Sequence, residues 1–176
     1  MEKKENKVHS PSVAGIVQVA LMAAIIFVTT YVIEIPVGTK AVLHIGDSMV
    51  FTGVVMLGKR KATIASAIGM GLFDLLSPYA IWSPFTFVIK GVMAYIAASI
   101  AYRKDYNGES LINNVFAFVI AGVWMIAGYY LAGGIIYGSL ITALGDIFGN
   151  VIQVAAGIII ALPIIKALRI TKFKIK

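Results

Sequence analysis

Two ionisable side chains stand inside apolar stretches of the chain, where a charge is costly. Asp74 falls in the apolar run 62–77 and Lys90 in the run 84–102. An ionisable group within a membrane span costs several kcal/mol unless it faces a cavity or a partner. Asp74 and Lys90 are therefore candidate ligand-binding residues. The alternative is a buried ion pair between them that stabilises packing without binding anything.

Helical spacing predicts the direction in which these side chains point. On each of the two runs, polar residues recur every three or four positions and so share one helical face. These faces carry Thr63, Ser66, Met70, Asp74 and Ser77 on the first run, and Ser83, Thr86 and Lys90 on the second. Both faces should point toward the protein interior.

Four further polar residues are expected near the same place. Asn150 and Gln153 lie one helical turn apart at the start of the last apolar run, with Asn150 a helix cap as its alternative. His44 and Asp47 end the segment that follows the first run, where Asp47 could instead be an N-cap and His44, like Lys40, a plain loop residue. Together these residues predict a polar pocket that opens outward.

The chemistry that the sequence lacks argues for binding rather than catalysis. There is no cysteine, and the two histidines are too few and too far apart for a metal cluster. No phosphate-binding loop, zinc-protease motif or nucleophile elbow occurs, so the chain should neither hydrolyse ATP nor need a cofactor of its own.

The elements that position these residues are membrane spans. Hydrophobic residues make up 60% of the 176 positions, charged residues 13%, and the mean hydropathy is +0.92, which excludes an ordinary soluble domain. Since a span takes roughly 20 apolar residues, the chain is one transmembrane domain over residues 1–176. The apolar runs are 13–33, 47–58, 62–77, 84–102, 112–131 and 148–168. The fold class is therefore all-α, a bundle of six transmembrane helices.

Basic residues predict the orientation of this bundle. Of the 15 Lys and Arg residues, 13 fall on one side of a six-span map, and the positive-inside rule makes that side cytoplasmic. Both termini are then cytoplasmic, with tails of about 1–12 and 169–176. The net charge of +7 is thus read as a topology signal rather than as nucleic-acid binding. Seven spans would put the basic tail outside, so residues 132–147 are expected to form a short outer helix or a re-entrant segment.

Several stretches, in order, resemble the substrate-binding S components of energy-coupling factor (ECF) vitamin transporters. The resemblance is to the branch with riboflavin-like, hydroxymethylpyrimidine and pyridoxine carriers, and it covers most of the chain. The stretches are Ile35-Pro36, His44-Ile45-Gly46-Asp47-Ser48, Leu57-Gly58-Lys59-Arg60-Lys61, Gly69 to Leu76 with Asp74, Pro84, Ile89-Lys90-Gly91, Gly149 to Gln153, Gly157 and Pro163.

The resemblance implies a six-helix subunit of the bacterial plasma membrane that captures a vitamin from outside. Its partners would be a transmembrane scaffold subunit and two ATPase subunits, which would use the ATP. The family's docking pattern, Ala-x-x-x-Ala on the first helix, is matched by Ala20 and Ala24. Small residues at this spacing also occur in ordinary helix packing.

The predicted function is therefore high-affinity binding of a pyridoxine-type or hydroxymethylpyrimidine ligand. Asp74, Lys90, Asn150 and Gln153 would contact its ring and hydroxyl groups, and Asp47 and His44 would help to close over it. A secondary transporter or channel that works alone is the nearer alternative, and a membrane enzyme acting on lipid head groups is the third.

Overall fold

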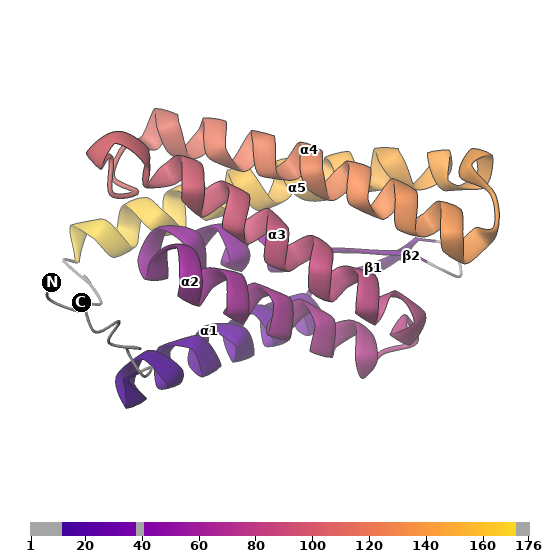
Figure 1. Cartoon of the computed structure of the whole chain (residues 1–176), viewed down its shortest axis with the longest axis horizontal. Helices are drawn as coiled ribbons and strands as arrows, with labels where there is room; N and C mark the ends of the chain where they lie inside the picture. The colour runs from indigo at the N-terminus through magenta and orange to yellow at the C-terminus, as the bar shows by residue number, and fades with distance from the viewer. Residues whose placement is uncertain (1–11, 38–40, 172–176) are drawn as a thin grey trace, which may run out of the picture.

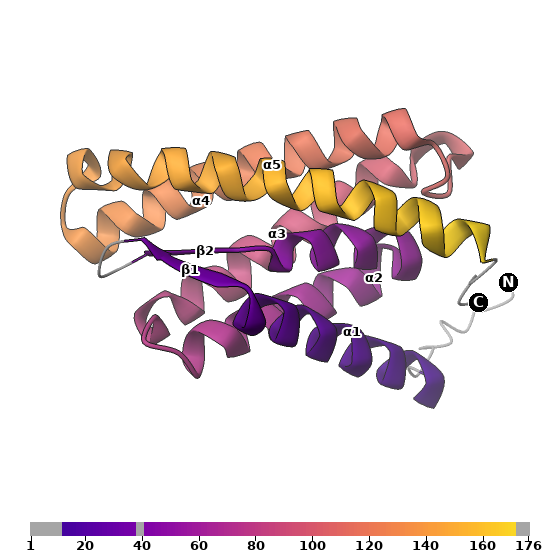
Figure 2. The ribbon, with the colours of Figure 1, turned by 180° about the vertical axis from the view of Figure 1, so that it is seen from behind.

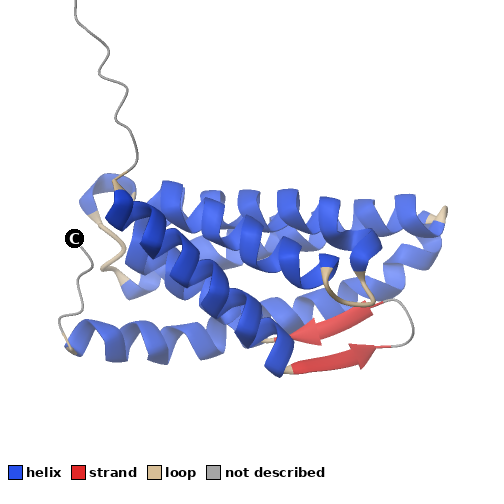
Figure 3. Ribbon diagram, turned by 90° about the horizontal axis from the view of Figure 1, so that it is seen from below, coloured by secondary structure: helices blue, strands red, loops and turns tan. Residues whose placement is uncertain are grey.

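The computed structural model describes residues 12–37 and 41–171. Its five helices are α1 (Val13–Val32), α2 (Gly46–Leu75), α3 (Ser83–Ala101), α4 (Leu111–Tyr137) and α5 (Leu140–Ile170). A two-stranded antiparallel hairpin, β1 (Glu34–Val37) and β2 (Ala41–His44), joins α1 to α2, and short 3-10 turns precede and follow α3, η1 (Ala80–Trp82) and η2 (Arg103–Asp105). The helices run along the long axis of the molecule (Figure 1), and the hairpin is the one sheet in the described chain (Figure 3).

The helix α2 is a hairpin of two helical halves rather than one straight rod. Gly58 interrupts it with φ 72° and ψ −177°, which are not helical angles. The methyl carbon of Met70 lies 2.9 Å from the point where a Cβ on Gly46 would stand, although a straight helix would separate these residues by about 36 Å. The sequence separates two apolar runs here, 47–58 and 62–77, and the reversal takes place at Gly58 alone.

Replacing Gly58 with alanine is expected to destabilise the fold by about 2 kcal/mol. Its backbone angles lie in a region that is essentially restricted to glycine. The control is Gly145→Ala, because Gly145 lies within α5 with open space around its Cβ position, and alanine favours helix. Thermal unfolding of both purified variants measures the difference. Equal midpoints would show that the α2 reversal tolerates a side chain.

The expectation of a separate outer segment at residues 132–147 is wrong. The helix α4 continues to Tyr137 and ends on Gly138, which is left-handed with φ 67°. Ser139 then caps α5 by accepting a hydrogen bond from the Thr142 amide. The stretch is therefore the tip of a tight helical hairpin, because one glycine and one capping serine complete both helix ends.

The prediction of an all-α bundle is confirmed. Among the five helices of the described residues, four stretches are long and apolar enough to cross a membrane: Val13–Val32, Ala80–Ala101, Leu111–Tyr137 and Leu140–Ile170. The helix α2 is not among them. Each half is short and the second half begins with three basic residues, Lys59 to Lys61.

The helix α2 lies at the centre of the bundle and contacts α1, α3 and α5, while α4 packs on α3 and α5. Glycines allow close approach: a Cβ on Gly69 would lie 2.7 Å from the carbonyl oxygen of Ala23 on α1. The buried face of α3 is lined with small residues, Ala94, Ala97, Ala98 and Ala101. Close packing of small residues is the usual basis of helix association in membranes.

The two ends of the bundle differ in chemistry. The start of α1, the turn of α2, the α3–α4 connection and the end of α5 share one end, and the β-hairpin, η1 and the α4–α5 turn share the other (Figures 1 and 2). At the first end, Lys61 Nζ donates to Gln18 Oε1 at 2.6 Å, and Arg169 donates to the carbonyl oxygen of Glu109 at 2.7 Å. The basic segments that are distant in sequence therefore gather at one end.

Candidate functional site

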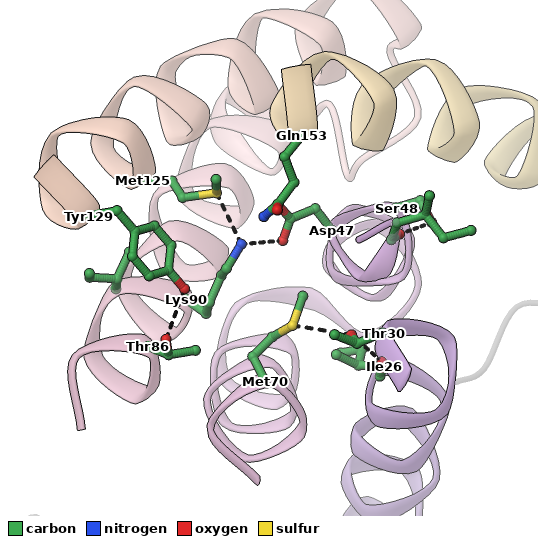
Figure 4. Close-up of polar contacts among 12 residues, drawn as sticks. Ile26, Thr30, Asp47, Ser48, Met70, Thr86, Lys90, Met125, Tyr129 and Gln153 are labelled. Atoms are coloured by element: carbon green, nitrogen blue, oxygen red, sulfur yellow. Dashed lines mark hydrogen bonds and ion pairs between the residues drawn. The ribbon is translucent and has the colours of Figure 1, made fainter. Parts of the chain in front are cut away.

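A buried cluster of three side chains joins α2, α3 and α5. The Lys90 ammonium lies 2.5 Å from Asp47 Oδ1, and Gln153 Nε2 donates to Asp47 Oδ2 at 3.0 Å (Figure 4). Asp47 and Lys90 are fully buried and Gln153 is 5% exposed. Both carboxylate oxygens of Asp47 thus have a donor, and the Lys90 charge has a counter-ion. Three of the six predicted site residues are in direct contact.

The position of Asp47 depends on close approach by two other helices. Asp47 lies in the first turn of α2, whose N-cap, Ile45, offers no side-chain hydrogen bond. A Cβ on Gly157 of α5 would lie 2.9 Å from the Asp47 Cβ, so only glycine lets α5 come this near. The alternative reading of Asp47 as an N-cap is wrong, because its oxygens bind side chains of α3 and α5. It also lies at the centre of the cluster rather than in a covering loop.

Lys90 has two further neighbours on α4. Its Nζ lies 3.0 Å from the Met125 sulfur and 5.4 Å from the centre of the Tyr129 ring. Thioether sulfur is a weak acceptor and an aromatic face attracts a cation, so both support the buried ammonium group. Nothing in the sequence indicated that Met125 contacts Lys90, because methionine is an ordinary apolar residue of a membrane span.

Asp74 does not form the alternative ion pair with Lys90. Asp74 is 7% exposed, and Thr86 on α3 is one of its neighbours. The Thr86 hydroxyl also lies 3.0 Å from the Tyr129 hydroxyl. Asp74 and Lys90 are near enough to interact electrostatically, but the counter-ion of Lys90 is Asp47. The predicted inward faces agree with this burial, since Ser66, Met70 and Thr86 are buried as well.

His44 ends β2 and packs edge-on against Phe73 of α2, with 5.8 Å between ring centres. Its Nδ1 is shielded from solvent and has no hydrogen-bond partner. Burial lowers the pKa of His44 from 6.5 to about 4. The charge of Asp47 opposes this shift, and the charge of Lys90 adds to it. The imidazole is therefore neutral at pH 7. His44 is thus part of the packed wall beside the cluster. The alternative, that His44 is a plain loop residue, does not hold.

This pKa predicts that acid destabilises the protein. Between about pH 6.5 and pH 4 the unfolded chain carries a proton on His44 that the folded protein does not, so the stability is complete above pH 6.5 and falls toward pH 4. The thermal midpoint of the wild type should drop between pH 7.5 and pH 5, and His44→Gln should drop less. An identical drop in both proteins would assign the acid sensitivity to other groups.

Asn150, Ala20 and Ala24 are not among the residues that bind Asp47 or Lys90. Asn150 is ten residues into α5 rather than at its start, and its Nδ2 donates to the backbone oxygen of Asp146 at 3.0 Å, so it is not a cap. Ala20 and Ala24 are exposed on α1. Lys40 is outside the described residues. Trp82 is 8% exposed, and its ring centre lies 6.0 Å from that of Tyr129.

The arrangement offers hydrogen bonds and charges but no reactive pair. It brings together two carboxylates, one ammonium group, one amide and two hydroxyls. These belong to Asp47, Asp74, Lys90, Gln153, Thr86 and Tyr129. No three His, Cys, Asp or Glu residues of the described ranges are grouped so that they could hold a metal ion. A few placed polar groups in an apolar surrounding are typical of a site that binds a small, flat molecule.

Comparison with known proteins finds similarity over most of the chain. The family model described as "ECF-type riboflavin transporter, S component" matches residues 10–170. The thiamine precursor transporter HmpT of Lactococcus lactis subsp. cremoris is 26% identical over 144 residues, which cover 81% of this chain and 80% of HmpT. A solved structure of the S component of a bacterial ECF transporter has a TM-score of 0.70 and 16% identity, covering 90% of this chain and 97% of the other. At that identity the structural likeness concerns the fold alone.

Proposed function

This chain belongs to the S-component family of ECF-type riboflavin transporters, and on that premise we propose that it binds hydroxymethylpyrimidine, a thiamine precursor, for uptake. The family consists of transporter components rather than enzymes. Similarity to HmpT supports the choice of ligand. The observation that carries the proposal is the buried cluster of Asp47, Lys90 and Gln153.

The ligand's chemistry fits the groups of this cluster and of its neighbour Asp74. A hydroxymethylpyrimidine has an amino donor, ring-nitrogen acceptors and a hydroxyl group. The Asp74 carboxylate can accept from N–H groups of the ligand, while Lys90 and Gln153 keep further N–H donors for a ring nitrogen and the hydroxyl. When the ring binds, the polar groups of the ligand and of the site pair with each other. A ligand that lacks one of these groups would leave a buried polar group of the site unpaired, so such a site discriminates strongly between ligands.

The membrane topology that we propose counts each half of α2 as a crossing, which gives six. The basic end of the bundle, with Lys61 and Arg169, is then cytoplasmic, and both termini lie there. The hairpin β1–β2 and η1 face outward, at the end where substrate would enter. The location is the bacterial plasma membrane.

We propose that transport uses ATP through partner subunits, as in other ECF transporters, since the chain itself has no phosphate-binding loop. We propose that a transmembrane scaffold subunit docks on α1, where Ala20 and Ala24 are exposed and a helix could approach closely. Two ATPase subunits would complete the importer. Their failure to co-purify with this chain from its own cells would favour a transporter that works alone.

The experiment that tests the ligand is calorimetry on the purified chain with hydroxymethylpyrimidine, pyridoxine and riboflavin. We expect saturable binding of hydroxymethylpyrimidine, and at least tenfold weaker binding of the other two. Gln153→Leu should weaken binding roughly tenfold, since it removes one donor and leaves Asp47 Oδ2 unpaired. Tighter binding of riboflavin or pyridoxine than of hydroxymethylpyrimidine would refute the assignment.

A further inference from the structure

We propose that the site binds its ligand as a monocation, with a protonated ring nitrogen donating to the Asp74 carboxylate. This inference rests on the proposed function and specifies the charge state of the ligand. It follows from how the buried charges are distributed among the described residues.

Asp47 already has a cationic partner within the protein. Lys90 binds its Oδ1 at 2.5 Å and Gln153 binds its Oδ2 at 3.0 Å. The pair Asp47 and Lys90 is electrically neutral. A ligand that replaced Lys90 on Asp47 would leave the ammonium group buried without a counter-ion, which is unfavourable.

Asp74 is in the opposite position. It is 7% exposed, and no Lys or Arg of the described chain forms an ion pair with it. The charged and titratable groups that face it are Lys90 from α3, already bound by Asp47, and Tyr129 from α4. The buried region thus holds two carboxylates, Asp47 and Asp74, and one ammonium group, Lys90. An uncompensated buried charge is costly, and a cation placed beside it removes that cost.

Two hydroxyls lie near the Asp74 carboxylate. Thr86 neighbours Asp74, and its hydroxyl lies 3.0 Å from that of Tyr129. An ionised carboxylate has about four acceptor sites, so Asp74 can accept from an N–H group of the ligand. A charge-assisted N–H to carboxylate bond is among the stronger hydrogen bonds. Asp74 therefore selects the protonated form of a weakly basic aromatic ring.

The test uses hydroxymethylpyrimidine labelled with ¹⁵N in the ring, bound to the purified full chain at pH 8, where the free base is neutral. We expect the ring-nitrogen resonance of the bound ligand to move to the protonated position. In Asp74→Asn the bound ring should be neutral, and binding should be roughly tenfold weaker or more. The matched control is Asp146→Asn, the same change at a half-buried residue of α5 that neighbours Tyr137 instead of Lys90, and both readouts should stay as in the wild type.

Each outcome has a distinct meaning. Saturable binding with a neutral ring in the wild type overturns the inference and leaves the proposed function intact. Absence of saturable binding in the wild type overturns both. If Asp74→Asn is not recovered folded, the ring resonance in the wild type decides by itself. If the ring stays protonated in a folded Asp74→Asn variant, a group other than Asp74 binds the cation, and the inference is contradicted.

Discussion

Lys90→Met is expected to lower the free energy of unfolding by about 3 to 5 kcal/mol, which corresponds to a fall of roughly 10 °C in the thermal midpoint. The substitution keeps a long unbranched side chain next to Met125 and Tyr129 and removes only the charge. Asp47 is fully buried and would lose the counter-ion that lies 2.5 Å from its Oδ1. A carboxylate in that position has one remaining side-chain donor, Gln153.

A second substitution separates stability from binding. The double variant Asp47→Asn with Lys90→Met removes both charges, so its unfolding midpoint should return close to that of the wild type. Its ligand binding should remain lost, because neither the ammonium group nor the carboxylate is present. Thermal unfolding in detergent and calorimetry on the same preparations measure the two effects.

The matched control for this cycle is Lys59→Met. Lys59 is exposed and its ammonium group lies 4.4 Å above the centre of the Tyr95 ring, an interaction worth about 1 kcal/mol or less. Its midpoint should change little. If Lys90→Met lowers the midpoint no more than Lys59→Met does, the buried pair of Asp47 and Lys90 does not stabilise the fold.

Gly46→Ala is the substitution with the next largest expected effect, a destabilisation of about 3 kcal/mol. A Cβ on Gly46 would overlap Oγ1 of Thr30 on α1, and would also lie 2.9 Å from the Met70 methyl carbon. Thr30 is fully buried and its hydroxyl donates to the Ile26 carbonyl oxygen at 2.7 Å, so it cannot simply turn away. The start of α2 would have to move.

This movement should weaken ligand binding as well, because Asp47 is the next residue. Adding Thr30→Ala to Gly46→Ala removes the overlapping hydroxyl and should recover part of both the stability and the affinity. Thermal unfolding and calorimetry on the single and double variants measure this coupling. Strictly additive effects would mean that α1 and the start of α2 are not in the contact that the structure shows.

The class of the protein and its buried polar faces could be predicted from the sequence, because both depend on local patterns. Hydropathy along the chain located the apolar segments, and the three-and-four spacing on either side of Asp74 and Lys90 predicted that both residues point inward. The Gly58 turn was also predictable, since a glycine followed by three basic residues interrupts an apolar stretch. Each of these properties is set by neighbours within a few residues.

The partners of those residues were decided by the tertiary structure. Asp47 and Lys90 are 43 positions apart and Asp47 and Gln153 are 106 apart, so their contact depends on how closely α2, α3 and α5 pack. That distance is set by glycines such as Gly157, whose role no local pattern reveals. The continuation of α4 and α5 through residues 132–147 was missed for a related reason. Hydropathy measures how apolar a stretch is, whereas the left-handed Gly138 and the cap at Ser139 determine where the chain turns.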